Sequence, residues 1–154
     1  MININELLKF AITIEVSSQE FYKNAQSKTN DSKTLTLLKE LYLEEQKHER
    51  LLQNLLDSCL YDGTVSLPSN LNINFKDSHN HPDESKEKLT FEDITNISLA
   101  RENKAILLFE NLLKFELPEE IKELFENLLK EEKSHHHQVS TLSKQIEGTM
   151  GNEN

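Results

Sequence analysis

The chain has 154 residues, enough for one domain with a buried core, and its three glycines and three prolines favour a helical protein. A formal net charge of −10 argues against nucleic acid or an anionic membrane surface as a partner. The single cysteine, Cys59, excludes an intramolecular disulfide and any zinc or iron–sulfur site built from cysteines of this sequence.

Two helices are predicted in the first half of the chain. The first runs from about Ile4 to Ser27, and the second follows the polar turn 28–31, where Asn30 or Asp31 can cap it, and runs to about Cys59. Each has one stripe of residues spaced three and four apart, which a helix buries. The stripes are Ile4, Leu8, Ala11, Glu15, Ser18, Tyr22 and Ala25, then Leu38, Leu41, Glu45, His48, Leu52 and Leu55.

Two more helices are predicted in the second half. Residues 60–89 show no sustained helical stripe and are interpreted as a connection. The third helix opens at Thr90, which forms a capping box with Asp93, and the fourth has Pro118 in its first turn. Their buried stripes are Phe91, Ile94, Ser98, Glu102, Ala105, Phe109 and Leu112, then Ile121, Phe125, Leu128, Glu132, His135, Val139, Leu142 and Ile146.

These lengths predict an all-α, ferritin-like antiparallel four-helix bundle with a long crossover between the second and third helices. Short turns join antiparallel pairs, whereas a link of roughly thirty residues spans the bundle from end to end. We expect residues 1–147 to form a single domain and residues 148–154 to be a flexible tail. No apolar run reaches the length of a membrane span, and no signal-peptide pattern opens the chain, so a cytoplasmic protein is expected.

The two halves repeat at an offset of 87 residues. Glu15 then corresponds to Glu102, Glu45 to Glu132 and His48 to His135. The sequence contains only two Glu-X-X-His motifs, and the offset that superposes them also superposes the two remaining glutamates and several apolar positions, including Tyr22 on Phe109. These matches share one offset and all lie on the buried stripes, which indicates that the polar residues have a common function.

That function is predicted to be the binding of two metal ions. Four carboxylates and two imidazoles facing a bundle interior carry a large desolvation penalty, which two divalent cations offset. One Glu from each of two helices plus one Glu-X-X-His from each of the others is the carboxylate-bridged pattern of such bundles. In that pattern Glu45 and Glu132 bridge, His48 and His135 each bind one metal, and Glu15 and Glu102 cap one apiece. Mixed oxygen and nitrogen ligands suit iron or manganese, and zinc stays open.

The phrase IEVSSQEFYKNA at 14–25, the two Glu-X-X-His helices and the long central link resemble the rubrerythrin branch of the ferritin-like superfamily. The resemblance implies two iron ions and redox chemistry on hydrogen peroxide or dioxygen. Rubrerythrins usually append a rubredoxin-like domain with two cysteine pairs, which this sequence does not contain, so a separate electron donor such as a rubredoxin-like protein is expected. They commonly carry a further Glu where this chain has Ala105, and its absence argues against redox-linked ligand exchange and efficient peroxidase activity.

Other readings of the same residues stay open. A ferritin-like protein that oxidises or stores iron would use the same six ligands, and a metal-free structural bundle would leave them as a buried polar network. Ser18 and Ala105 are interpreted as small packing residues that border a pocket for the oxidant, and Tyr22 and Phe109 as core aromatics, with Tyr22 able to hydrogen-bond a ligand carboxylate. His136, His137, His79 and His81 are expected at the surface, Cys59 in the core, and the protein as a homodimer or larger homo-oligomer.

Overall fold

The structure is a computed structural model that describes residues 2–58, 63–65 and 83–151; for Ile2, Val65 and residues 146–151 only the backbone is described. Four helices make up most of it: α1 (Ile4–Ala25), α2 (Ser32–Asp57), α3 (Phe91–Leu112) and α4 (Glu119–Gly151). A short 3₁₀ turn, η1 (Gln26–Lys28), follows α1, and two short strands, β1 (Ile2–Asn3) and β2 (Thr64–Val65), complete the described elements.

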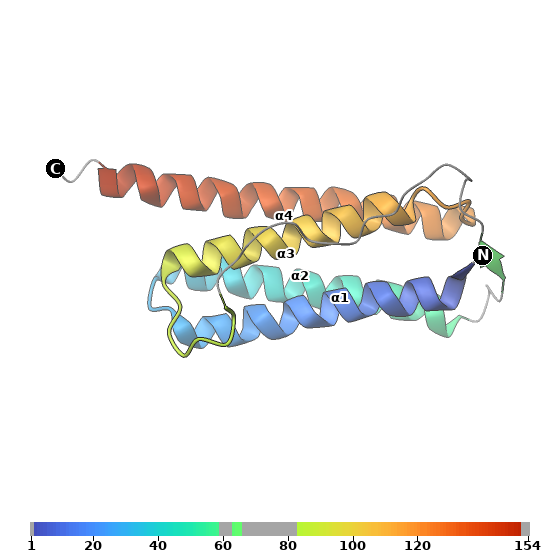
Figure 1. The fold of residues 1–154 in the computed structure, drawn as a ribbon, viewed down its shortest axis with the longest axis horizontal. Coiled ribbons are helices and arrows are strands. Elements are labelled where there is room, and N and C mark those ends of the chain that lie inside the picture. The colour runs from blue at the N-terminus through green and yellow to red at the C-terminus, as the bar shows by residue number, and fades with distance from the viewer. Residues whose placement is uncertain (1, 59–62, 66–82, 152–154) are drawn as a thin grey trace.

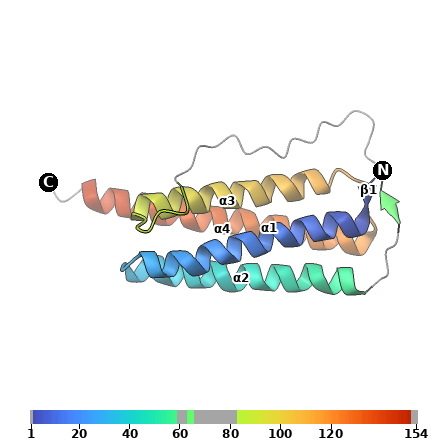
Figure 2. The ribbon, with the colours of Figure 1, turned by 60° about the horizontal axis from the view of Figure 1, so that its bottom comes forward.

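The helices form an elongated bundle in which all four axes run nearly parallel (Figure 1). Consecutive helices pack most extensively, α1 on α2 and α3 on α4, while contacts between α1 and α3 and between α2 and α4 close the bundle. Figure 2 shows the same two pairs from another side, with α1 and α2 forming one pair. The predicted ferritin-like antiparallel four-helix bundle is therefore confirmed.

Local capping explains where three of the helices begin. The side chain of Asn3 accepts a hydrogen bond from the amide of Asn5 at the start of α1, and Asp31 accepts from the amide of Thr34 at the start of α2. Thr90 and Asp93 form the predicted capping box at the start of α3. The fourth helix begins at Glu119, one residue after Pro118, whose carbonyl accepts from the amide of Lys122.

The described ends of the central connection lie at opposite ends of the bundle. Near its start, β2 pairs antiparallel with β1, directly before α1, with Ile2 opposite Val65. Near its end, the carbonyl of Glu84 accepts a hydrogen bond from Lys28, which follows the far end of α1. The connection between α2 and α3 therefore begins at one end of the bundle and ends at the other, which fits the predicted crossover. Cys59, His79 and His81 lie outside the described residues.

The apolar core is divided into two clusters by a polar layer. One cluster gathers at the end where α1 begins and includes Leu8, Leu52, Phe109, Leu112 and Phe125. The other gathers at the opposite end and includes Phe21, Tyr22, Leu38, Leu41 and Val139. Between them lie buried glutamates and histidines from all four helices. Among the described residues, this is the one level at which all four helices contribute buried polar side chains.

The buried stripes follow the sequence prediction closely. Of their members, Leu55, Phe91 and Leu142 are only partly buried, and the side chain of Ile146 is not described. Helix α4 continues to Gly151, so it runs on into the segment predicted as a flexible tail from residue 148. Among the described residues, no helix combines the length and apolar character needed to cross a lipid bilayer.

Candidate metal centre

The polar layer consists of the six residues singled out by the sequence repeat. One comes from α1, two from α2, one from α3 and two from α4: Glu15, Glu45, His48, Glu102, Glu132 and His135. Each is at most 5% exposed. Within each Glu-X-X-His motif the two side chains share a helix face, because residues three apart lie nearly above one another. The structure therefore brings all six together in the middle of the bundle.

The six residues form two overlapping groups of four. Potential ligand atoms of Glu15, Glu45, His48 and Glu132 all lie within 4.8 Å of one another, and so do those of Glu45, Glu102, Glu132 and His135. Glu45 and Glu132 belong to both groups. Each group thus contains one histidine and one glutamate of its own and shares two carboxylates, which is the arrangement needed for two bridging ligands.

Both histidines direct Nδ1 at the carboxylates. His48 Nδ1 lies 2.9 Å from Glu132 Oε1, 3.4 Å from Glu15 Oε2 and 3.5 Å from Glu45 Oε2. His135 Nδ1 lies 3.4 Å from Glu45 Oε1, 3.6 Å from Glu102 Oε2 and 3.7 Å from Glu132 Oε2. The two rings stack with their centroids 5.7 Å apart and their planes at 17°. The two nitrogens therefore occupy equivalent places in the two groups.

Unpaired buried atoms show that the protein side chains do not satisfy one another. Among the described residues, seven buried side-chain nitrogen and oxygen atoms lack a hydrogen-bond partner, and all seven belong to these six residues. They are both carboxylate oxygens of Glu15, one oxygen each of Glu45, Glu102 and Glu132, and Nδ1 of His48 and of His135. Buried polar atoms are normally paired, so this concentration of exceptions indicates a missing ligand. Two divalent cations would match both the donor atoms and the four carboxylate charges.

The protonation of the centre without metal follows from the same contacts. Burial alone would lower the pKa of His48, but the close carboxylates of Glu132 and Glu45 outweigh this effect and raise the pKa to about 11. In the same way, burial opposes the charge of His135, while Glu102, Glu132 and Glu45 raise its pKa to about 12. Protons on the two imidazoles therefore partly take the place of cations.

The carboxylates of the centre differ in their protonation. Burial would raise the pKa of Glu45, but the two histidines beside it lower that pKa overall. Burial and the neighbouring Glu132 charge raise the pKa of Glu102 well above its usual value. Without metal, Glu102 therefore tends to hold a proton, while Glu45 stays ionised.

Comparison with known proteins places this centre in a family. The family model described as Rubrerythrin matches residues 6–143. The chain belongs to the rubrerythrin family. A solved structure from Thermotoga maritima, described as a ferritin-like diiron-carboxylate protein, superposes with a TM-score of 0.74 at 16% identity. The match covers 94% of this chain and 97% of the other. A hypothetical protein from Pyrococcus furiosus superposes with a TM-score of 0.69 at 24% identity, covering 94% and 90%. None of the curated proteins matches the sequence.

The positions beside this rubrerythrin-type centre are closely packed. Ser18 on α1 and Ala105 on α3, equivalent in the repeat, are 5% and 4% exposed. At Ala105, where rubrerythrins commonly have a further Glu, the chain offers no ligand, and Glu102 is the only carboxylate among the buried residues of α3. A role for Ser18 and Ala105 in admitting an oxidant stays a prediction.

A tyrosine makes the two capping glutamates unequal. The hydroxyl of Tyr22, which is fully buried, donates a hydrogen bond to Glu102 Oε1, as predicted for this side chain. Its repeat equivalent, Phe109, has no hydroxyl and packs on Phe125 with ring centroids 5.7 Å apart. Accordingly, both oxygens of Glu15 lack a partner, whereas in Glu102 only Oε2 does. Burial and the nearby Glu102 charge also raise the pKa of Tyr22 well above its usual value.

Glu131 is a functional candidate that our sequence analysis missed. Its Oε2 lies 2.5 Å from Nε2 of His48, on the side of the ring that faces away from the centre. A hydrogen bond donated by Nε2 fixes the ring and leaves Nδ1 free to bind a metal. The sequence repeat could have pointed to this residue, because Glu131 corresponds to Glu44 and each of them directly precedes a predicted bridging glutamate. No hydrogen bond joins Nε2 of His135 to another described residue, so the two histidines are held differently.

Replacing Glu131 with Ala is expected to weaken metal binding at the His48 position by about 10- to 100-fold, the usual effect of losing such a supporting contact. Glu131→Gln keeps an acceptor for Nε2 and should restore most of the affinity. Competitive titration with a chelator of known affinity measures both. Glu44→Ala, the matching change in the other half, should leave the equilibrium affinity near that of the wild type. An equal loss in Glu131→Ala and Glu44→Ala would contradict a specific role for the contact with His48.

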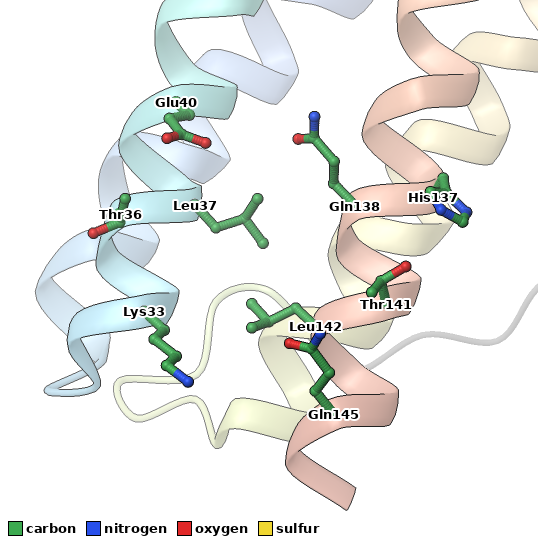
Figure 3. A pocket seen from close by; sticks show the side chains of 9 residues that line it. All are labelled: Lys33, Thr36, Leu37, Glu40, His137, Gln138, Thr141, Leu142 and Gln145. Atoms are coloured by element: carbon green, nitrogen blue, oxygen red, sulfur yellow. The ribbon is translucent and has the colours of Figure 1, made fainter. Parts of the chain in front are cut away.

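The two histidines that follow His135 lie away from the centre. His137 is exposed and borders a groove between α2 and α4 (Figure 3). His136 is partly buried, so the expectation of a surface position holds for His137 and only in part for His136. Neither belongs to a group of residues that could hold a metal among the described part of the chain.

Proposed function

We propose that this protein is a di-iron redox enzyme that reduces hydrogen peroxide or reacts with dioxygen, using electrons from a separate donor. The observation that supports it most directly is the set of seven unpaired buried atoms, all on the six residues of the centre. Family membership favours iron over manganese or zinc. Two bound iron ions would supply the electrons and the affinity for oxygen that no side chain provides.

The residues of the chain have separate roles in this proposal. Glu45 and Glu132 bind both ions, while His48 with Glu15, and His135 with Glu102, complete one position each. The apolar clusters on both sides exclude water from the centre, which strengthens every electrostatic interaction inside it. The Tyr22 hydroxyl is hydrogen-bonded to Glu102 Oε1 and can return a proton to that carboxylate.

The partners proposed here follow from composition and surface. The sequence contains one cysteine and therefore no cysteine-ligated iron site of its own, which supports an external donor such as a rubredoxin-like protein. Among the described residues, four large apolar side chains are exposed, which supports a homodimer or larger homo-oligomer: Phe10, Leu43, Leu51 and Leu107.

A second function, oxidation and storage of iron in the manner of ferritins, is favoured by one observation. Ala105 occupies the place of the extra rubrerythrin glutamate, and α3 offers the centre only Glu102. Without that additional ligand, the two metal positions should keep the same ligands in the oxidised and reduced states. Such a centre suits repeated turnover of iron as substrate as well as it suits peroxide reduction.

The first test is stoichiometry. Protein loaded with Fe²⁺ under anaerobic conditions should retain two ions per chain after desalting, separated by roughly 3.5–4 Å as in other two-metal sites. Elemental analysis gives the count, and X-ray absorption spectroscopy gives the separation. A count of one ion per chain or fewer would contradict the dimetal proposal.

The second test separates the two functions. The ferrous protein is mixed in a stopped-flow instrument with equal concentrations of hydrogen peroxide or dioxygen, and oxidation is followed by absorbance. A peroxide reaction at least ten-fold faster supports peroxide reduction. A faster dioxygen reaction, with further Fe²⁺ oxidised beyond two ions per chain, supports iron storage instead.

A further inference from the structure

A hollow of about 370 Å³ opens on the surface between α2 and α4, next to the metal centre. Glu40, Glu44 and Lys47 of α2 and Glu131 of α4 line it. Figure 3 shows Glu40 and Gln138 at one end of the neighbouring groove, and because both also line the hollow, the two depressions follow the same seam between these helices. The hollow therefore occupies the part of that seam nearest the centre.

The hollow reaches a ligand of the centre. His135 lines it, although this side chain is only 5% exposed. Nδ1 of the same ring lies within 3.7 Å of Glu45, Glu102 and Glu132 and has no hydrogen-bond partner. The imidazole of His135, whose Nε2 forms no hydrogen bond with a described residue, thus lies between the surface hollow and the interior carboxylates.

Carboxylates form a third potential cation site at this surface. Ligand atoms of Glu44, His48 and Glu131 lie within 4.8 Å of one another, and both glutamates are only partly buried. Lys47, whose Nζ lies 3.4 Å from Glu131 Oε1, is the one lysine or arginine among the described residues that line the hollow, and His135 is the other lining side chain that can carry a positive charge. The three carboxylates outnumber these two groups and leave the hollow negative, which concentrates cations there.

We propose that divalent metal ions enter and leave the centre through this hollow, with Glu44 and Glu131 as transit ligands and His135 as the last side chain they pass. The inference rests on the proposed function, because it presupposes a metal centre. A carboxylate pair at the surface replaces part of the hydration shell of an arriving cation before it is buried. A transit ligand lowers the barrier in both directions, so Glu44 should change the rates of binding and release without changing the equilibrium affinity. Glu131 also holds the His48 ring, so its replacement affects the affinity as well.

Stopped-flow mixing of the metal-free protein with Co²⁺ alone tests this route, since visible absorption reports Co²⁺ reaching the carboxylate–histidine sites. Glu44→Gln should slow association about ten-fold, which is the lower end of the rate increase that focused charge produces. It should slow the release of Co²⁺ into excess chelator to a similar degree. Lys47→Gln should accelerate association and make it more dependent on salt. Glu123→Gln, an exposed carboxylate of α4 outside the hollow, removes the same charge and should match the wild type.

The outcomes separate this route from the centre itself. If wild-type protein takes up no Co²⁺, the proposed function fails. If wild-type protein binds two ions and Glu44→Gln associates as fast as Glu123→Gln, the centre stands and the entry route is wrong. A rate change in Lys47→Gln of the same sign as in Glu44→Gln would also overturn the route, because opposite charges at one entrance must act in opposite directions.

Discussion

Replacing Glu45 and Glu132 together with glutamine should reduce the retained metal from two ions per chain to none. These two residues belong to both groups of four potential ligands, so the double change removes two carboxylate ligands from each metal position. Glutamine has nearly the same volume and a neutral amide, and each imidazole can lose its proton once the carboxylates that raise its pKa are gone, so no unpaired charge needs to stay buried. The helical circular dichroism of the metal-free protein should therefore be unchanged.

The matched control removes two charges from the same helices outside the centre. Asp57 and Glu123 are exposed residues of α2 and α4, and Asp57→Asn/Glu123→Gln should bind two ions with wild-type affinity. Elemental analysis after anaerobic loading compares the proteins. Retention of two ions by Glu45→Gln/Glu132→Gln would show that these carboxylates do not bridge. Loss of metal in both double variants would point to a general effect of net charge.

The bundle and the gathering of the six polar residues were predictable because helices impose a strict geometry on sequence spacing. Glu15, Glu45 and Glu102 each stand where the spacing of apolar neighbours calls for a buried side chain, and each is buried. The offset of 87 residues then relates α1 to α3 and α2 to α4, which places the ligands at one level. That these side chains bind metal remains a prediction that the experiments above address.

Other features of the centre depend on side-chain contacts between helices, which spacing within one helix does not reveal. The bond from His48 to Glu131 joins α2 to α4, and the bond from Tyr22 to Glu102 joins α1 to α3. The repeat predicts equivalent halves, but Glu131 contacts Nε2 of His48, whereas no described residue forms a hydrogen bond with Nε2 of His135. The pairing of β1 with β2 could not be predicted from the sequence either, because strands of two residues are too short to show an alternating pattern.

The placement of the polar layer between two apolar clusters relates stability to function. Tyr22, Leu38 and Leu41 on one side, and Leu52 and Phe109 on the other, are at most 1% exposed, and packing of this density holds helices in a fixed register. The unpaired atoms between them oppose folding without metal. We infer that the clusters supply the stability that the centre lacks, so the protein can fold before metal arrives.

Metal affinity should depend steeply on pH, because each bound ion must displace a proton from a histidine. In the metal-free protein the pKa of His48 is about 11 and that of His135 about 12, so both rings are protonated at neutral pH. A metal binds only the unprotonated nitrogen. The apparent dissociation constant of each ion should therefore fall about ten-fold for each unit of pH between 6 and 8. The raised pKa of Glu102 acts in the same direction.

The stability of the metal-free protein should change in the opposite sense. Both histidines have folded-state pKa values above the ordinary 6.5, so their pairing with carboxylates contributes fully below pH 6.5 and is lost as the pH rises toward 11 to 12. Raising the pH thus weakens the metal-free fold and strengthens metal binding. The difference in Tm between metal-loaded and metal-free protein should widen as the pH rises.

Calorimetric titration with Co²⁺ in two buffers of different ionisation enthalpy counts the displaced protons directly. At pH 8 the wild type should release at least two protons per chain as both positions fill, although free histidines with ordinary pKa values would release almost none at that pH. Asp57→Asn/Glu123→Gln, which leaves every residue of the centre in place, should release the same number. Filling of both positions without proton release at pH 8 would mean that the imidazoles are already neutral, and that another arrangement compensates the buried carboxylates before metal binds.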